Sequence, residues 1–117
     1  LIRRQRQMCI RDSPYELLKN KLIKANIFDY FSYVIGGDQV ERNKPYPDIY
    51  NKAISKLQTT KNIVIEDSPP GISSGKESGS FVVAIDRGIF SKDELNKADL
   101  IVDNLSIDII ETVFNSL

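Results

Sequence analysis

Residues 62–71 read Asn-Ile-Val-Ile-Glu-Asp-Ser-Pro-Pro-Gly, and they carry the strongest signal of secondary structure in the sequence. Its β-branched run at 63–65 is typical of a parallel strand covered on both faces. Glu66 and Asp67 follow at once, and Ser68 can cap a helix whose first turn tolerates the two prolines that come next. The stretch therefore predicts a buried strand that runs into a helix, with two carboxylates at the junction.

Strands and helices alternate outward from this junction in both directions. Apolar spacing predicts helices over 14–26 with Ser13 as N-cap, over 68–79, and in a short stretch at 91–95. It also predicts a helix from 47 to about 58, with an apolar stripe of Ile49, Tyr50, Ala53, Ile54 and Leu57. A last helix is predicted over 107–117, with Ile107, Ile110, Phe114 and Leu117 facing inward. Strands are predicted over 33–35, 62–65, 81–85 and 100–102. Because short loops join these elements, we predict a parallel α/β sheet with helices on both sides.

Composition limits the chain to one small domain of 117 residues. Its 16 basic and 16 acidic side chains cancel, so no basic field favours nucleic acid or an anionic membrane. The apolar run at 81–85 is far shorter than the roughly 20 residues of a membrane helix. No secretory signal is visible and Cys9 is the single cysteine, so we expect a soluble protein of the reducing cytoplasm.

The first thirteen residues differ in character from the rest, because LIRRQRQMCIRDS has no apolar period. Residues 3–13 resemble the translation of a transposase sequencing adapter. We therefore expect residues 1–13 to be non-native, with no native contacts over 1–12, and residues 14–117 to be the native part. The alternative is a natural basic N-terminal arm. Without the segment the chain is mildly acidic and has no cysteine.

Three sets of polar residues are candidates for chemistry. Adjacent carboxylates repel, and Mg²⁺ could compensate Glu66 and Asp67, although an acidic helix start explains them equally well. Two prolines bracket Lys44 and restrict its backbone. The compact ammonium of Lys44 suits a phosphoryl oxygen, and the alternative is that it is a solvated lysine of a loop. The third set, residues 86–88 (Asp-Arg-Gly), follows a strand and could be merely a turn.

The order of the motifs resembles the haloacid dehalogenase superfamily, in its phosphatase and phosphoglucomutase-like branch. These motifs are Gly-Gly-Asp at 36–38, Lys-Pro-Tyr-Pro-Asp-Ile-Tyr at 44–50, Glu-Asp-Ser-Pro-Pro-Gly-Ile at 66–72 and Gly79. The resemblance covers residues 13 to about 103. It implies a Rossmann-like three-layer parallel sheet, in which Lys44 orders the phosphate and the nucleophilic aspartate. It also implies that Glu66 and Asp67 bind Mg²⁺.

The resemblance implies a Mg²⁺-dependent phosphatase that acts on a small phosphorylated metabolite through an aspartyl-phosphate intermediate. A sugar-phosphate mutase shares these motifs. A non-catalytic phosphate-binding or metal-binding α/β module is the alternative from another class. Neither nucleic acid nor a membrane is expected as a partner.

The departures from the family pattern concern the N-terminal half of the domain. The family's D-x-D nucleophile and its cap domain have no match here, and its phosphate-binding Ser or Thr falls at Arg11. By the resemblance, the first two strands lie between the strands at 33–35 and 63–65. We therefore expect a C-terminal part of the domain that has no nucleophile of its own and has open strand edges, and that is inactive and poorly folded alone.

Overall fold

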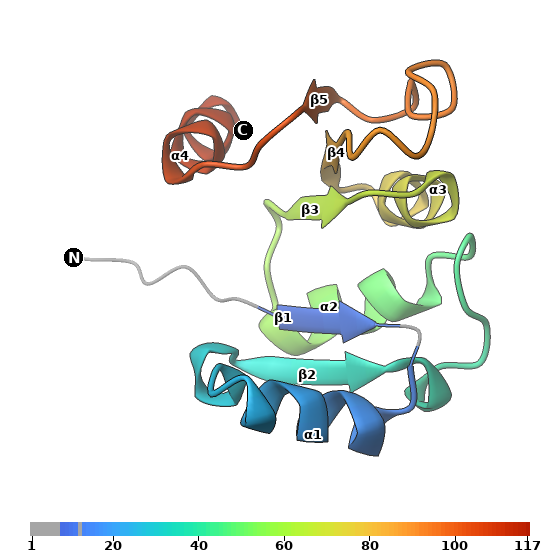
Figure 1. Cartoon of the computed structure of the whole chain (residues 1–117), viewed down its shortest axis with the longest axis vertical. Helices are drawn as coiled ribbons and strands as arrows, with labels where there is room; N and C mark the ends of the chain where they lie inside the picture. The colour runs from blue at the N-terminus through green and yellow to red at the C-terminus, as the bar shows by residue number, and fades with distance from the viewer. Residues whose placement is uncertain (1–7, 12) are drawn as a thin grey trace.

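The computed structural model describes residues 8–11 and 13–117, in which helices and strands alternate (Figure 1). The elements are β1 (Met8–Arg11), α1 (Tyr15–Lys24), η1 (Phe28–Tyr30), β2 (Tyr33–Gly36), η2 (Gly37–Gln39), α2 (Asp48–Leu57), β3 (Ile63–Glu66), α3 (Pro69–Glu77), β4 (Phe81–Ile85), β5 (Leu100–Val102) and α4 (Ile107–Ser116). Every strand pair is parallel, as predicted for an α/β fold. No helix in the described ranges is long and apolar enough to cross a membrane.

The strands form two sheets. One holds β1 and β2, and the other has the order β3-β4-β5. Helices α1 and α2 both contact β2, whereas α3 contacts β3 and β4. Figure 1 shows β1 lying between β2 and β3, and the arrows of these three strands point the same way. The expected break between the strands at 33–35 and 63–65 is therefore present, but it lies between β1 and β3.

The prediction that residues 1–12 have no native contacts is wrong for Met8–Arg11. This segment pairs in register with the whole of β2, and Ile10 packs against the hydrophobic core. The expectation rested on the arginines and glutamines of the segment, yet its most apolar part is the part that forms the strand. The rest of residues 1–12 lies outside the described residues, and the non-native origin of residues 1–13 stays a prediction.

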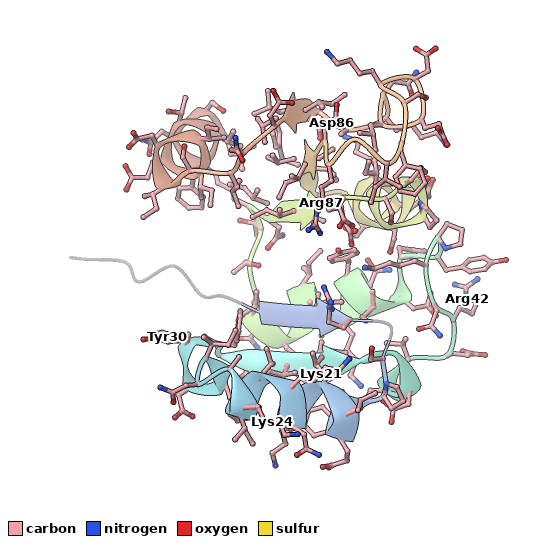
Figure 2. All side chains as sticks on the ribbon, in the orientation of Figure 1. Lys21, Lys24, Tyr30, Arg42, Asp86 and Arg87 are labelled. Atoms are coloured by element: carbon pink, nitrogen blue, oxygen red, sulfur yellow. The ribbon has the colours of Figure 1, made fainter. Side chains whose placement is uncertain are left out.

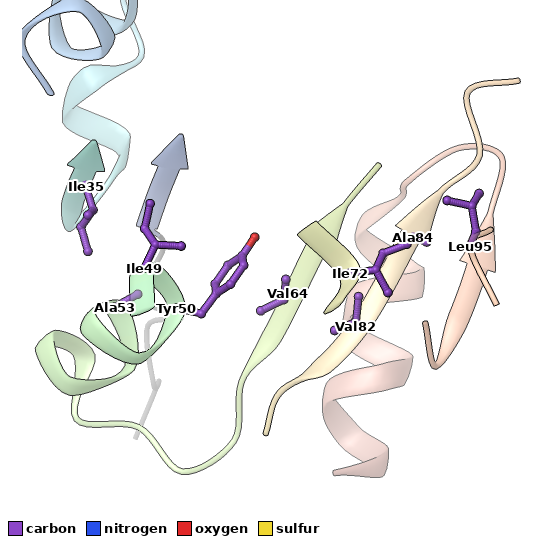
Figure 3. Packing of buried hydrophobic residues seen from close by; sticks show 9 residues of the cluster. All are labelled: Ile35, Ile49, Tyr50, Ala53, Val64, Ile72, Val82, Ala84 and Leu95. Carbon is purple, nitrogen blue, oxygen red and sulfur yellow. The ribbon is translucent and has the colours of Figure 1, made fainter. Parts of the chain in front are cut away.

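One hydrophobic core connects the two sheets. Its buried members come from β2, α2, β3, α3, β4 and the turn before β5, and Figure 3 shows them: Ile35, Ile49, Tyr50, Ala53, Val64, Ile72, Val82, Ala84 and Leu95. Helix α2 contributes three of them from the stripe that the sequence predicts. Because α2 packs against the two-stranded sheet and shares a core with β3 and β4, it holds the two sheets together.

The junction after β3 forms as the sequence predicts. The Oγ of Ser68 accepts a hydrogen bond from the N–H of Gly71 at 3.4 Å, and prolines occupy the first two positions of α3. Gly79 lies just beyond the helix with φ +83°, a conformation that glycine adopts without strain. The carboxyl end of β3 is thereby fixed against the first turn of α3.

Four details differ from the sequence prediction. Pro14, not Ser13, is the N-cap residue of α1. The short helix predicted at 91–95 is absent; these residues form turns, in which Ser91 and Glu94 are hydrogen-bonded to each other. In α4, Val113 is buried while Ile107 is exposed. Ile65 of β3 is 40% exposed, so the prediction that both faces of this strand are covered is wrong at that position.

Candidate functional site

Lys44 and Glu66, which lie 22 residues apart in the sequence, meet in the structure. Lys44 belongs to the loop before α2, and Glu66 is the last residue of β3. The Lys44 Nζ donates to the Glu66 Oε1 at 2.6 Å, with side-chain exposures of 12% and 8%. Two residues that the sequence places at one site are therefore brought together as a buried ion pair.

Tyr50 is the third member of this cluster, and sequence reasoning missed its role by counting it only as an apolar position of α2. Its hydroxyl donates to the same Glu66 oxygen, and the Lys44 Nζ lies 5.5 Å from the centre of its ring. A buried tyrosine hydroxyl needs a polar partner, so a tyrosine on the inner stripe of a helix was the available signal. Both donors fix one oxygen of the carboxylate.

The Glu66 carboxylate lies directly against Gly71 in the first turn of α3. A Cβ atom at Gly71 would stand 1.9 Å from the Glu66 Oε2, closer than any real contact. The Glu66 carboxylate can therefore occupy this place only because residue 71 has no side chain. The Gly that follows the two carboxylates in the sequence is part of the site.

Asp67 faces a different environment from Glu66. Its side chain is 48% exposed, and its Oδ2 accepts a hydrogen bond at 3.2 Å from Nη1 of Arg87, which follows β4 (Figure 2). The third candidate set thus reaches the site through Arg87, while Asp86 only closes a turn by accepting from the N–H of Gly88 at 2.9 Å. An exposed pair of this kind holds Asp67 weakly.

An ion pair and a hydrogen bond hold the loop that carries Lys44. Arg42 and Asp48 form an ion pair with a 2.9 Å contact, and their hydrogen bond raises the pKa of the Arg42 guanidinium and lowers that of the Asp48 carboxyl. Ser74, fully buried in α3, donates its hydroxyl to the Tyr46 carbonyl at 2.7 Å. The Lys44–Pro45 peptide bond, which lies between Arg42 and Tyr46, is cis. These contacts place the Lys44 stem before any ligand binds.

The donor chemistry of the two adjacent carboxylates fits Mg²⁺. This ion prefers oxygen ligands and is usually held by one or two carboxylates together with water and substrate phosphate. Within the part of the chain that the structure describes, no group of three or more His, Cys, Asp or Glu side chains is gathered for a metal. Glu66 and Asp67 would therefore offer two protein ligands at this position, and further oxygens would have to come from elsewhere.

Residues 11–85 of the chain match the family model described as haloacid dehalogenase-like hydrolase. The chain belongs to this family. The matched region includes the Lys44 loop, both carboxylates and the junction after β3. The sequence resemblance to the haloacid dehalogenase superfamily is thereby confirmed.

Relatives of this haloacid dehalogenase-like chain include two curated phosphatases and a solved mutase. It is 28% identical to validoxylamine A 7′-phosphate phosphatase of Streptomyces hygroscopicus subsp. limoneus over 83% of the chain and 46% of that protein. It is 32% identical to the phosphorylated carbohydrates phosphatase of Thermotoga maritima over 57% of the chain and 32% of that protein. The structure of beta-phosphoglucomutase from Clostridium difficile aligns with a TM-score of 0.71 at 27% identity, over 83% of the chain and 44% of that protein. The chain therefore spans less than half the length of each.

Proposed function

We propose that this chain supplies Lys44, Glu66 and Asp67 to the active site of a Mg²⁺-dependent phosphatase that acts on a small phosphorylated metabolite. The observation that carries the proposal is the buried Lys44–Glu66 pair beside Asp67 at the carboxyl end of β3. Ligands of open parallel sheets collect at this end of the strands. By their names, one curated relative is a phosphatase of validoxylamine A 7′-phosphate and the other a phosphatase of phosphorylated carbohydrates, which supports the substrate class.

Each residue has a role that its surroundings favour. Lys44 presents a compact positive charge, which suits a phosphoryl oxygen and keeps a nearby aspartate anionic. Glu66 orients that ammonium, and together with Asp67 it would hold Mg²⁺, which neutralises phosphate charge when bound. The nucleophilic aspartate is expected in the part of the parent protein that this chain does not span.

The test restores the upstream reading frame from the source genome and assays the full-length protein with an aryl phosphate and Mg²⁺. Lys44→Met and Asp67→Asn should each lower kcat by about 10²–10³-fold, the usual cost of removing one group that stabilises transition-state charge. Lys92→Gln, a change at an exposed lysine in the turns before β5, is the matched control and should leave kcat unchanged. An Mg²⁺-dependent rate that survives Asp67→Asn would contradict the metal assignment.

The chain by itself is expected to show no turnover, because no nucleophilic aspartate is assigned to it. Purified chain, assayed under the same conditions, should match the uncatalysed rate. Mg²⁺-dependent turnover that Lys44→Ala abolishes would show that the nucleophile lies within these 117 residues. An upstream reading frame without a D-x-D motif would instead favour a non-catalytic phosphate-binding or metal-binding module.

A sugar-phosphate mutase is the second candidate, and the similarity to the beta-phosphoglucomutase structure favours it. Both activities would use the same three residues and would differ in what accepts the phosphoryl group. Phosphorus NMR of the full-length protein with a sugar phosphate separates them. Release of inorganic phosphate indicates the phosphatase, whereas an isomeric sugar phosphate without net release indicates the mutase.

A further inference from the structure

Among the described residues that form the buried hydrophobic core, Tyr50 alone carries a polar side-chain group. It is 7% exposed, and the other buried members of the cluster are aliphatic. Figure 3 shows its ring between α2 and β3, with the hydroxyl at the end that points away from the helix. Phenylalanine would fill the same space with no polar atom to satisfy, so packing alone does not require a hydroxyl here. Packing therefore explains the ring of Tyr50 but not its oxygen.

The two oxygens of the Glu66 carboxylate have different surroundings. Oε1 accepts a hydrogen bond from the Lys44 Nζ at 2.6 Å and a second one from the Tyr50 hydroxyl. Oε2 lies against Gly71 and accepts no hydrogen bond from the described residues. Because no buried side-chain oxygen or nitrogen of those residues lacks a partner, Oε2 keeps access to solvent. A carboxylate oxygen with free lone pairs is a ligand for Mg²⁺, so Oε2 is the oxygen of Glu66 that is left for the ion.

The two donors to Oε1 differ in their freedom to turn elsewhere. The Lys44 ammonium has three protons on a flexible stem and, under the proposed function, also contacts a phosphoryl oxygen. The Tyr50 hydroxyl has one proton, which it donates to Glu66, and its ring is fixed in the core as part of α2. The hydroxyl need not move when the ammonium bonds to a phosphate. Tyr50 is therefore the donor that can hold Glu66 throughout the reaction.

We propose, resting on the proposed function, that Tyr50 is a positioning residue whose hydroxyl holds Oε1 of Glu66 and so presents Oε2 to Mg²⁺ beside Asp67. Tyr50 itself contacts neither the ion nor the substrate and acts through Glu66. Groups that hydrogen-bond a metal ligand fix its orientation, and their removal usually costs about 10–100-fold in metal affinity or activity. Loss of the hydroxyl should therefore weaken the binding of Mg²⁺ and leave the binding of substrate to the loaded enzyme unchanged.

The test uses the full-length protein whose upstream reading frame has been restored. Its unfolding midpoint should rise with Mg²⁺ concentration, because the folded state binds the ion, and this dependence gives the Kd for Mg²⁺. In Tyr50→Phe this Kd should rise at least about tenfold, whereas the KM for an aryl phosphate at saturating Mg²⁺ should change less than about twofold. Because phenylalanine keeps the ring in the core, the variant should stay folded.

Two control variants separate positioning from packing. Tyr30→Phe removes the hydroxyl of a tyrosine that is 74% exposed, and it should change neither the metal-free midpoint nor the Kd for Mg²⁺. Ile49→Val removes a methyl group from a fully buried neighbour of Tyr50 in α2. It should lower the metal-free midpoint and leave the Kd for Mg²⁺ unchanged.

The outcomes for Tyr50→Phe are distinguishable. If it has only a lower metal-free midpoint, as expected for Ile49→Val, the hydroxyl serves stability alone and the proposal is overturned. A raised KM for the aryl phosphate with an unchanged Kd for Mg²⁺ would overturn it as well, since the hydroxyl would then act on the substrate. In both cases the unchanged protein still binds Mg²⁺ and turns over, so the proposed function stands. Unchanged protein with neither Mg²⁺ binding nor turnover would instead contradict the proposed function, and this inference with it.

Discussion

The two-stranded and three-stranded regions of the molecule are covered to different degrees. In the three-stranded region, the middle of β4 is fully enclosed, since Val82, Val83 and Ala84 are all 0% exposed. In the two-stranded region Ile35 is buried, but Tyr33 on the same strand is 44% exposed. A strand with neighbours on both edges and a helix on its face is protected, whereas a strand in a short sheet depends on what lies beside it.

The candidate site lies where these two regions meet. Lys44 and Tyr50 come from the side of the two-stranded sheet, Glu66 from the three-stranded side, and Ser74 reaches back to the Lys44 loop. A buried ion pair contributes little net stability compared with apolar residues of similar size. Because this pair joins the two regions, removing one of its partners should affect both regions together.

The largest effect is expected from Lys44→Ala. It leaves the Glu66 charge buried without its cation and should lower the free energy of unfolding by about 3–5 kcal/mol, as breaking other buried pairs does. Urea denaturation followed by circular dichroism measures this, with Arg42→Ala, in an exposed pair of the same loop, as the matched control. Replacing the whole cluster, as Lys44→Met with Glu66→Leu and Tyr50→Phe, should recover most of the loss, because no buried polar group then loses its partner. An unchanged urea midpoint for Lys44→Ala would show that the two regions do not depend on this pair.

Gly71→Ala should have the next largest effect, because the added Cβ overlaps the Glu66 carboxylate. Overpacking of this kind costs about 1–3 kcal/mol, and here it also pushes Glu66 away from Lys44. Ser73→Ala, in the same helix, is the matched control and should be neutral, since alanine favours helices. The same urea titration compares the two variants. Equal midpoints would mean that the Glu66 side chain adopts another conformation without loss of stability.

Ser74→Ala removes the hydrogen bond between α3 and the Lys44 loop. The expected loss is about 1 kcal/mol, because the hydroxyl is fully buried and the Tyr46 carbonyl loses its donor. Ser78→Ala, which removes a bond to Gly75 within the three-stranded region, is the control. Hydrogen exchange should speed up in the Lys44 loop for Ser74→Ala alone. Similar exchange in both variants would mean that the loop is held by Arg42 and Asp48 instead.

Local patterns predicted most of the elements, and long-range pairing accounts for most of what was missed. The bounds of β4 and β5, the inner stripe of α2 and the cap at Ser68 follow from residue spacing and were confirmed. The strand at Met8–Arg11 was missed because its formation depends on the neighbouring edge of β2, which no local pattern describes. The exposure of Ile65 was missed for the same reason.

The candidate site was predictable in composition but not in geometry. The family resemblance placed Lys44, Glu66 and Asp67 in one site, and the roles given to them there remain predictions. That Lys44 and Glu66 form a direct contact across 22 residues could not be read from spacing. The Tyr50 hydroxyl and the Arg87 contact to Asp67 were equally hidden, since each depends on how a helix or loop lies over the end of β3.

The smallest effect expected is the acid sensitivity of the three-stranded region, which rests on Asp99. Desolvation acts to raise the pKa of this carboxyl, but hydrogen bonds from the Lys76 ammonium and the Val82 N–H outweigh it and lower the pKa below its ordinary value. A carboxyl with a lowered pKa in the folded state stabilises the fold above its unfolded pKa of about 3.9, and this contribution is lost as the pH falls through the folded value. Because the pair is partly exposed, we expect less than about 1 kcal/mol.

Asp99→Asn should accordingly make the unfolding midpoint depend less on pH below about 4. Near neutral pH, the dependence of the midpoint on pH should be the same as in the unchanged chain. The matched variant is Asp48→Asn in the Lys44 loop, whose carboxyl pKa is also lowered, in that case by the hydrogen bond from Arg42. Asp48 lies in an exposed ion pair of the loop, whereas Asp99 accepts a hydrogen bond from the Val82 N–H in the middle of the sheet. The loss of acid sensitivity should therefore be larger for Asp99→Asn than for Asp48→Asn. Thermal unfolding of both variants between pH 2 and pH 7 decides this. A greater loss of acid sensitivity for Asp48→Asn would reverse the comparison and show that acid first loosens the loop that carries Lys44.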